Sequence, residues 1–286
     1  MNVVEKAVAL REANEAAAAF FKENYGTAEG LYAIAADVVL PMIEADVMAE
    51  DITMLLLDEV PSQKGDIRWA KKPKHKAYYI GEDGNFKASP DEAAYVTPDP
   101  RLLTCEPEFN KLEMERGHIG SLDEQREAAT DAIVKSKNSE VVSMLVNGVD
   151  ATMEFTHAAT LDKGTLDDAI TAGEDQGLRP VLIVMRGTRG GDIKDYTLPQ
   201  TVSADLLTKG VQGIVYSGAQ IMYTPDMGTD EVLVIFDKKA GRIMTEFELT
   251  ADDVVSAGGV KLKMPMYTVY RAAMTNTKRV AVITIT

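Results

Sequence analysis

Three histidines and one cysteine are the residues of this chain that could bind a metal or act as a nucleophile. His75, His118 and His157 lie far apart, and none has the short spacing to another histidine or to Cys105 that zinc ligands show. Cys105 and His118 could form a nucleophile–base pair, but no nucleophile motif surrounds the cysteine, and a lone cysteine more often packs in a core. These residues therefore predict neither a metal site nor a catalytic centre.

One glycine-rich segment has the composition of a phosphate-binding loop. Residues 187–191 are GTRGG, and their backbone amides could surround a phosphate. The segment lacks the Lys-Ser/Thr ending of a P-loop and the glycine spacing of a dinucleotide-binding fingerprint, so a flexible turn is the simpler interpretation. Carboxylates are numerous, 45 in all, so their adjacency carries little information. We predict no cofactor and no enzymatic activity.

The composition is that of a folded protein. Hydrophobic residues make up 45% of the chain and charged residues 26%. A chain of 286 residues can bury a substantial core, as one elaborate domain or two closely associated ones. No apolar stretch is long enough to span a bilayer, so no membrane partner is expected. The single cysteine excludes an internal disulfide and favours an intracellular origin.

The net charge of −15 is unevenly distributed. Residues 1–60 hold 12 acidic side chains against three basic ones. Residues 61–80 contain one acidic residue and six basic ones: Lys64, Arg68, Lys71, Lys72, Lys74 and Lys76. An acidic protein with one basic segment is not typical of a general nucleic-acid binder. Two interpretations of this basic segment stay open, a solvated loop or a segment that docks onto an acidic surface of a neighbouring copy.

The first 60 residues carry helical patterns with few turns between them. Residues 3–21 are rich in Ala and Glu and predict a helix. Residues 31–48 carry a second helical pattern, which Pro41 is expected to interrupt, and 52–57 is a short apolar run. With so few turns to fold it back, this region could be an extended arm.

Residues 62–104 have a different character. Aromatic and aliphatic residues stand here in an extended-type context around the turn signal GEDGN at 81–85. The pattern predicts a long, hairpin-like excursion. Loops of this length without a core of their own are uncommon unless they have a function.

A long amphipathic helix is predicted from Ser121 to Gly148. The sequence SLDE at 121–124 matches a capping box, and Gly148 is a natural stop about seven turns later. Apolar residues recur behind the cap near helical spacing: Leu122, Ala129, Ile133, Val142, Leu145 and Val149.

The second half alternates a helix with many strands. Thr165 is expected to open a helix that Gly177 closes, followed by a buried strand at 178–185 and a loop running into a helical turn at 187–196. The segment 237–241 is expected to turn a hairpin. Strands are predicted at 214–216, 220–224, 231–236, 243–249, 260–270 and 279–286. The fold class is α+β, with the sheet elements concentrated late in the chain.

The segment SLDEQREAATDAIVKSKNSEVVSMLVNGVD resembles the long spine helix of tailed-phage major capsid proteins, whose Hong-Kong-type fold is shared with encapsulins. TLDDAITAGEDQGLRPVLIVMRGTRGGDIKDY is similar to the helix–strand–helix of their axial domain. LLTKGVQGIVYSGAQIMYTPDMGTDEVLVIFDKKAGRI is similar to the strand passage that follows, with matching residues at Leu206, Gly210, Gly213, Ile214, Gly218, Gly228 and Asp237. The resemblance covers about residues 121–250 and is a pattern of elements, not an active-site signature.

This resemblance implies a Hong-Kong-type phage capsid fold with a long spine helix, a peripheral domain, an axial domain, an extended loop and an N-terminal arm. The arm would comprise residues 1–60 and the extended loop 61–104. The peripheral domain would be 105–160, with the spine helix at 121–148, and the axial domain 161–250. The C-terminal strands at 251–286 would return to these domains.

The resemblance also implies a function. A major capsid protein would self-assemble, through hexamers and pentamers, into an icosahedral shell that encloses double-stranded DNA without sequence-specific contacts. A portal protein and scaffolding or decoration proteins would be its partners, and the virion its location after assembly in the host cytoplasm. The basic segment would lie at a subunit interface. An encapsulin-type shell around protein cargo is the alternative with the same fold, and a metabolic enzyme with an unrecognised site is the alternative from another class.

Overall fold

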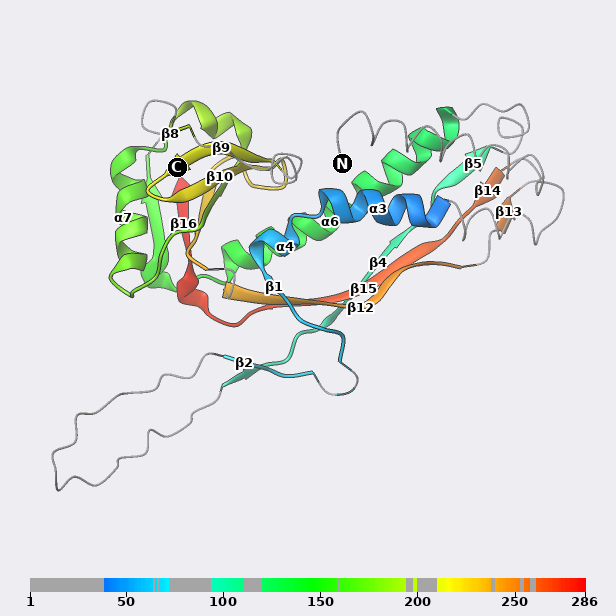
Figure 1. Cartoon of the computed structure of the whole chain (residues 1–286), viewed down its shortest axis with the longest axis horizontal. Coiled ribbons are helices and arrows are strands. Elements are labelled where there is room, and N and C mark those ends of the chain that lie inside the picture. The colour runs from blue at the N-terminus through cyan, green and yellow to red at the C-terminus, as the bar shows by residue number, and fades with distance from the viewer. Residues whose placement is uncertain are drawn as a thin grey trace, which may run out of the picture. The chain divides into compact units, whose positions relative to one another are not determined.

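The computed structural model describes residues 39–63, 65, 67–71, 94–110, 120–158, 160–193, 198–199, 210–237, 240–252, 255–257 and 261–286. Contacts divide the chain into two compact units. The first unit is formed by residues 1–51, 101–138 and 245–270, and the second by 52–100, 139–244 and 271–286. Figure 1 labels the elements along the chain.

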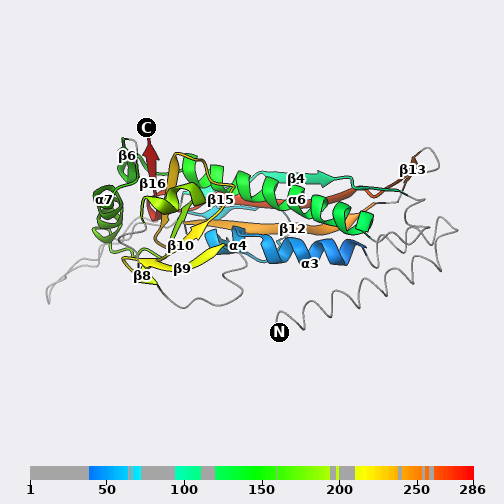
Figure 2. The same ribbon diagram turned by 90° about the horizontal axis from the view of Figure 1, so that it is seen from above.

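Helix α3 (Leu40–Glu50) packs against helix α6 (Gly120–Asn147) in the first unit, and both views show the two helices side by side (Figures 1 and 2). Pro41 lies in the first turn of α3, so this helix begins at the proline that was expected to interrupt the 31–48 pattern, and residues 31–38 lie outside the described residues. Proline is tolerated there because the first amides of a helix have no intrahelical acceptor. The core between the helices and the strands consists of Val39, Ile43, Phe109, Ala129, Ile133, Met264 and Met266.

Strands of the first unit take part in two small sheets, one of three strands and one of four. Antiparallel strands β13 (Val255–Ala257), β14 (Lys261–Lys263) and β5 (Glu108–Asn110) form one sheet. The other has the order β1-β12-β15-β4, from Asp58–Glu59, Gly241–Ala251, Met266–Met274 and Pro100–Cys105. The pattern at 260–270 thus belongs to two strands in different sheets, because Pro265 has no amide with which to continue a ladder.

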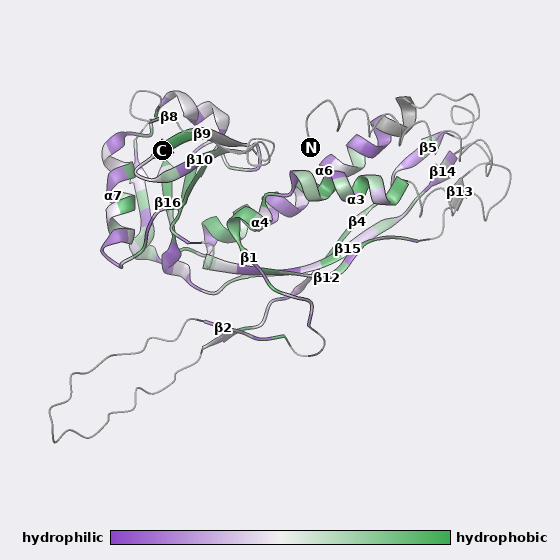
Figure 3. Cartoon of the chain, viewed as in Figure 1, coloured by the Kyte–Doolittle hydropathy of each residue, from purple (hydrophilic) through white to green (hydrophobic). Residues whose placement is uncertain are grey.

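A seven-stranded sheet forms the second unit, in the order β6-β16-β11-β7-β10-β9-β8. In that order the strands are Glu154–His157, Val280–Ile285, Glu231–Ile235, Leu182–Met185, Ala219–Tyr223, Val211–Tyr216 and Leu198–Pro199. The central strand β7 is buried along its whole length. Figure 3 shows the hydrophobic character of β9 and β16. The strands predicted at 214–216, 220–224, 231–236 and 279–286 are therefore confirmed, and the one predicted at 243–249 is confirmed in β12 of the four-stranded sheet. Of the strand predicted at 178–185, only Leu182–Met185 is a strand.

Helix α7 (Lys163–Glu174) packs on this sheet through Leu166, Ala169 and Ile170. Its N-cap is Asp162, whose carboxylate accepts from the Thr165 amide at 2.8 Å, so the expected start at Thr165 is wrong by one turn. Gly177 closes the helix as predicted, with a positive φ of 73°.

The connections after β7 and β11 differ from expectation. Residues Gly187–Gly191 form a 3-10 helix instead of a loop, and 194–197 lie outside the described residues. The hairpin predicted at 237–241 is wrong, because β11 and β12 belong to different sheets. Arg279 holds this connection through an ion pair with Asp237 at 2.8 Å, and the amide of Thr275 donates to the Ala240 carbonyl at 3.0 Å.

The long helix is confirmed. Helix α6 spans 28 residues, and of the predicted apolar face the residues Ala129, Ile133, Val142 and Leu145 are buried. Val149, just beyond the helix, packs against the core of the second unit. The side chains of residues 121–123 lie outside the described part, so Leu122 and the capping box stay predictions.

A buried ion pair joins α6 to the end of α3. The Lys137 ammonium lies 2.6 Å from the Asp51 carboxylate, and the two side chains are only 10% and 8% exposed. The ammonium also lies 5.7 Å from the centroid of the Tyr270 ring. Because Asp51 is the C-cap residue of α3, the pair fixes where this helix ends on α6.

The hairpin-like excursion predicted at 62–104 has a paired stem. Strand β2 (Trp69–Ala70) is antiparallel to β3 (Tyr95–Val96), and the Lys71 amide donates to the Ala94 carbonyl at 2.7 Å (Figure 1). Trp69 is buried against Met244 and Ala273. Residues 72–93, between the two halves of the stem, lie outside the described residues.

The N-terminal arm expected at 1–60 is only partly described. From Val39 onward the chain is packed, since Ile43 in α3 and Leu56 in α4 (Thr53–Leu56) are fully buried. Residues 39–60 thus contain packed helices, and 1–38 lie outside the described residues. The remaining boundaries between arm, loop, peripheral and axial domains stay predictions.

We predict that Ile133→Asp prevents soluble folding, because an unpaired carboxylate at this buried position costs several kcal/mol. Ala132→Asp, at the exposed neighbouring position, is the matched control and should fold normally. Soluble expression and circular dichroism measure the difference. Normal folding of both variants would contradict the orientation of α6.

We predict that Lys137→Met lowers the free energy of unfolding by about 3–5 kcal/mol, because it removes the ammonium that lies 2.6 Å from the buried Asp51 carboxylate. Asp51→Asn should have a similar effect, and the double variant should lose less than the sum of the two. Asp46→Asn is the control, since the Asp46 pair with Arg126 is more exposed and should contribute about 1 kcal/mol or less. Denaturant titrations of all four variants test this, and additive losses would contradict the coupling.

Candidate assembly surfaces

The predicted interface residues are partly described. Arg68 and Lys71 are exposed and flank the buried Trp69 on the stem of the hairpin. Alternation along this strand turns Ile67 and Trp69 inward, which directs Arg68 outward. Lys64, Lys72, Lys74 and Lys76 lie outside the described residues. The returning side of the hairpin is held by Arg271, which donates to the Pro98 carbonyl at 2.9 Å.

An acidic surface forms where α3 packs on α6. Here the carboxylates of Asp46, Glu127 and Asp131 act electrostatically on Glu50 at the end of α3, and Asp46 is paired to Arg126 at 3.0 Å. Burial raises the pKa of Glu50 most, and the other three carboxylates raise it further. The sequence shows an excess of acidic residues in this region, but not that α3 brings Glu50 to α6. No signal in the sequence specifies this pairing of helices.

A ladder of ion pairs connects strands β5 and β14 in the first unit. Lys261 lies 2.8 Å from Glu108, and Lys263 lies 2.9 Å from Glu108 and 3.2 Å from Glu106. Hydrogen bonds from Lys261 and then Lys263 lower the pKa of Glu108 to about 2. Glu108 is therefore ionised at every pH near neutrality, and the two lysines are neutralised within the sheet.

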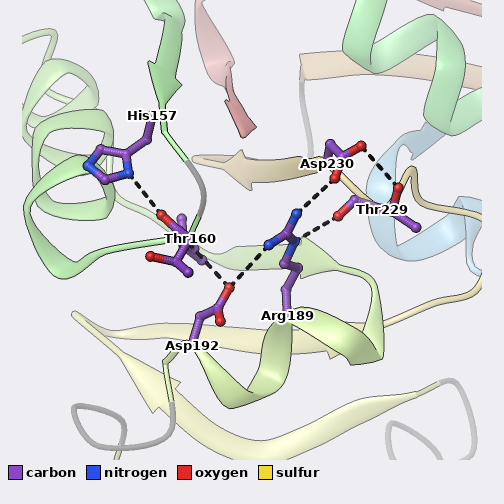
Figure 4. Close-up of polar contacts among 7 residues, drawn as sticks. His157, Thr160, Arg189, Asp192, Thr229 and Asp230 are labelled. Carbon is purple, nitrogen blue, oxygen red and sulfur yellow. Dashed lines mark hydrogen bonds and ion pairs between the residues drawn. The ribbon is translucent and has the colours of Figure 1, made fainter. Parts of the chain in front are cut away.

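Arg189 links three loops of the second unit (Figure 4). Its guanidinium lies 2.8 Å from Asp230 and 3.5 Å from Asp192, and its Nε donates to the Thr229 carbonyl at 2.8 Å. Asp192 in turn accepts from the Leu161 amide at 3.3 Å. The arginine of the GTRGG segment is thus engaged by carboxylates within the fold, which argues against a phosphate cradle there.

His157 lies beside the same loops. One ring nitrogen, Nδ1, is 2.8 Å from the Thr160 carbonyl (Figure 4), and Nε2 is 3.3 Å from the Asp162 carboxylate. Hydrogen bonds from Thr165 lower the pKa of Asp162, and the nearby His157 lowers it further. The ring therefore contacts groups that cap α7 and hold its loop, a local structural role.

The remaining candidates for chemistry are not brought together in the part of the chain that the structure describes. Cys105 is half-buried, and burial raises the pKa of its thiol, the opposite of what activates a nucleophile. His75 and His118 lie outside the described residues. Among the described His, Cys, Asp and Glu residues, no group of three or more could hold a metal ion. No described helix is both long and apolar enough to cross a membrane.

Solved structures with a similar fold include a virus-like particle from Pyrococcus furiosus, 11% identical, with a TM-score of 0.56 over 87% of this chain and 99% of that one. The capsid of cyanophage P-SCSP1u is 9% identical, with a TM-score of 0.59 over 81% and 86%. A structure from Gordonia phage Cozz is 15% identical, with a TM-score of 0.59 over 83% and 87%. No protein-family model and no curated protein matches the sequence.

This chain has the Hong-Kong-type capsid fold. The resemblance seen in the long helix and the strands after it is thereby confirmed at the level of the fold. At identities of 9–15% the comparison carries no residue-level correspondence. The roles of individual surfaces therefore rest on the contacts described above.

We predict that Arg189→Met lowers the free energy of unfolding by about 1–3 kcal/mol, because it leaves part-buried acceptors without their donor. Hydrogen exchange at the Leu161 amide should become faster, since Asp192 loses its anchor. Arg186→Met, at the half-buried position just before the 3-10 helix, is the control. Unchanged exchange at Leu161 would show that the three loops are held by other contacts.

Proposed function

We propose that this chain is a major capsid protein, which self-assembles into an icosahedral shell around double-stranded DNA. The observation that carries the proposal is the fold, which it shares with the cyanophage P-SCSP1u capsid over 81% of this chain. A shell-forming architecture thus accounts for most of the molecule. In this proposal the role is structural, and hexamers and pentamers are the units of the shell.

The charge distribution supports association between copies. The stem of the hairpin carries Arg68 and Lys71 outward, and the sequence adds four further basic residues nearby. The chain as a whole is nevertheless acidic, with a net charge of −15. We propose that Lys64, Arg68, Lys71, Lys72, Lys74 and Lys76 lie at a subunit interface, because opposite charges guide encounter and register. The negative net charge is consistent with a shell that encloses DNA without binding its phosphates tightly.

The further partners and boundaries belong to the same proposal. A portal protein and scaffolding or decoration proteins would join the shell, which would assemble in the host cytoplasm and become part of the virion. Helix α6 would act as the spine of a peripheral domain, and the seven-stranded sheet would be the centre of an axial domain. A shell that encloses protein cargo is the second candidate, favoured by the match to 99% of the Pyrococcus furiosus virus-like particle chain. A metabolic enzyme remains the alternative from another class.

Purification of the recombinant protein tests the proposal. Size-exclusion chromatography and negative-stain microscopy should show closed shells. Shells that carry host protein and exclude nucleic acid would favour the cargo compartment. A protein that stays a monomer or dimer at all concentrations would contradict both shell functions.

We predict that changing Lys71, Lys72, Lys74 and Lys76 together to Glu slows or abolishes shell assembly while the subunit stays folded. Exposed charges contribute little to the stability of a monomer but much to association between charged surfaces. The same four positions changed to Arg keep the charge and provide the matched control. Light scattering across a salt series measures assembly, which for the wild type should weaken as salt rises. Equal rates for wild type and the Glu variant would show that the basic segment is a solvated loop.

A further inference from the structure

We propose that Asn147 is a site of spontaneous deamidation, and that its hydrogen bonds to Ser143 at the end of α6 set the rate. Asn147 is the only asparagine of the sequence that precedes a glycine. Glycine has no side chain to obstruct its amide nitrogen, so an asparagine before glycine closes a succinimide ring more readily than one before a larger residue. The inference concerns a chemical modification of the chain and does not depend on the shell function.

The reaction uses only the two residues and water. The Gly148 nitrogen attacks the side-chain carbonyl carbon of Asn147, and the amide proton passes to a base in the solvent. The new N–C bond closes the ring while the bond from that carbon to Nδ2 breaks, and the side-chain nitrogen takes up a proton and leaves as ammonia. Water then opens the ring at one of its two carbonyls, which gives aspartate or isoaspartate at position 147.

The end of α6 restrains both reacting groups. The side-chain nitrogen of Asn147 donates to the Ser143 carbonyl at 2.8 Å and to the Ser143 hydroxyl at 3.0 Å. The Gly148 amide donates to the Met144 carbonyl at 3.0 Å. Attack requires the Gly148 nitrogen to leave this carbonyl and the Asn147 side chain to turn away from Ser143. Breaking both restraints is therefore part of the path to the succinimide.

Asn147 is placed where this path can open. It is exposed to solvent and is the last residue of α6. The ends of helices fray and open more readily than their interiors. Asn138 lies inside the same helix, is only 2% exposed and precedes a serine. One helix thus carries a labile asparagine and a protected one.

Packing keeps the labile dipeptide in place. A Cβ atom at position 148 would lie 2.3 Å from the Met274 sulfur and 2.9 Å from the Met144 carbonyl oxygen, both closer than real Cβ contacts. The second of these atoms belongs to the backbone of α6, which cannot turn aside as a side chain can. The fold therefore favours glycine after Asn147, and the hydrogen bonds to Ser143 are left to slow the reaction.

The products would change this end of the helix. The Asn147 amide donates to the Ser143 carbonyl, whereas a carboxylate can only accept, so this hydrogen bond would be lost. The new negative charge would lie at the C-terminus of α6, the negative end of the helix dipole. Isoaspartate would also lengthen the main chain by one methylene immediately before Gly148, which lies against Met274. Deamidation would therefore destabilise the junction between α6 and the segment that follows it.

Incubation of the full-length protein at mildly alkaline pH, followed by peptide mapping with mass spectrometry, tests the inference. Ser143→Ala removes the hydroxyl acceptor, and Ser143→Thr keeps it. Ser139→Ala, at an exposed position one turn earlier on α6, is the matched control because it brings the same gain in helix propensity. Asn147→Gln keeps an amide but would have to close a six-membered ring, which forms far more slowly, so it should give no product at this position.

Aspartate and isoaspartate should accumulate at position 147 of the wild type, while Asn138 stays unmodified. Loss of one hydrogen bond corresponds to a rate change of about two- to tenfold, so Ser143→Ala should deamidate faster than Ser139→Ala by that factor. Ser143→Thr should react as slowly as the wild type. Equal rates for the two alanine variants, or a threonine variant as fast as Ser143→Ala, would overturn the role of Ser143. Folded wild type without product at 147, when the urea-denatured chain is already converted, would overturn the site itself.

Discussion

One buried ion pair, between Lys137 and Asp51, joins α6 to the end of α3 beside their shared apolar core. Removing two charges from water is costly, and their attraction offsets that cost only when the geometry is good. Here the 2.6 Å contact is supported by the Tyr270 ring and lies at the end of α3. A rotation or shift of α3 would separate the charges inside the core. The pair therefore adds to the apolar contacts of Val39 and Ile43 a constraint on the orientation of this helix.

The orientation of α3 determines what the molecule presents to its surroundings. With Ile43 inward, Met48 and Ala45 face outward, and Glu50 lies close to Glu127 and Asp131 on α6. The same buried pair thus fixes a core and an acidic, partly apolar surface at once. In the second unit Arg189 connects separate loops through its contacts with Asp192, Asp230 and the Thr229 carbonyl.

The sequence was sufficient for elements whose periodicity is strong and local. The long helix was predictable because Ala129, Ile133, Val142 and Leu145 follow its period, and β7 because LIVM is apolar throughout. The start of α7 was missed because Thr165 and Asp162 both suit a helix N-terminus, and only the geometry shows that Asp162 caps it. The hairpin expected at 237–241 failed for a different reason. Hydrophobic alternation identifies a strand but not the sheet to which it belongs.

The candidate site was predictable only in its basic half, and the reason is physical. Six cations within a short stretch are visible in a sequence because they are neighbours along the chain. The acidic half is formed by carboxylates from α3 and α6, which are far apart along the chain and meet only through tertiary packing. Neighbouring carboxylates disfavour one another's ionised form, because like charges repel. A cation that binds beside them removes this repulsion. Screening by salt would weaken both this repulsion and any attraction to a cationic partner, because exposed charges are screened within about 10 Å at 0.1 M salt.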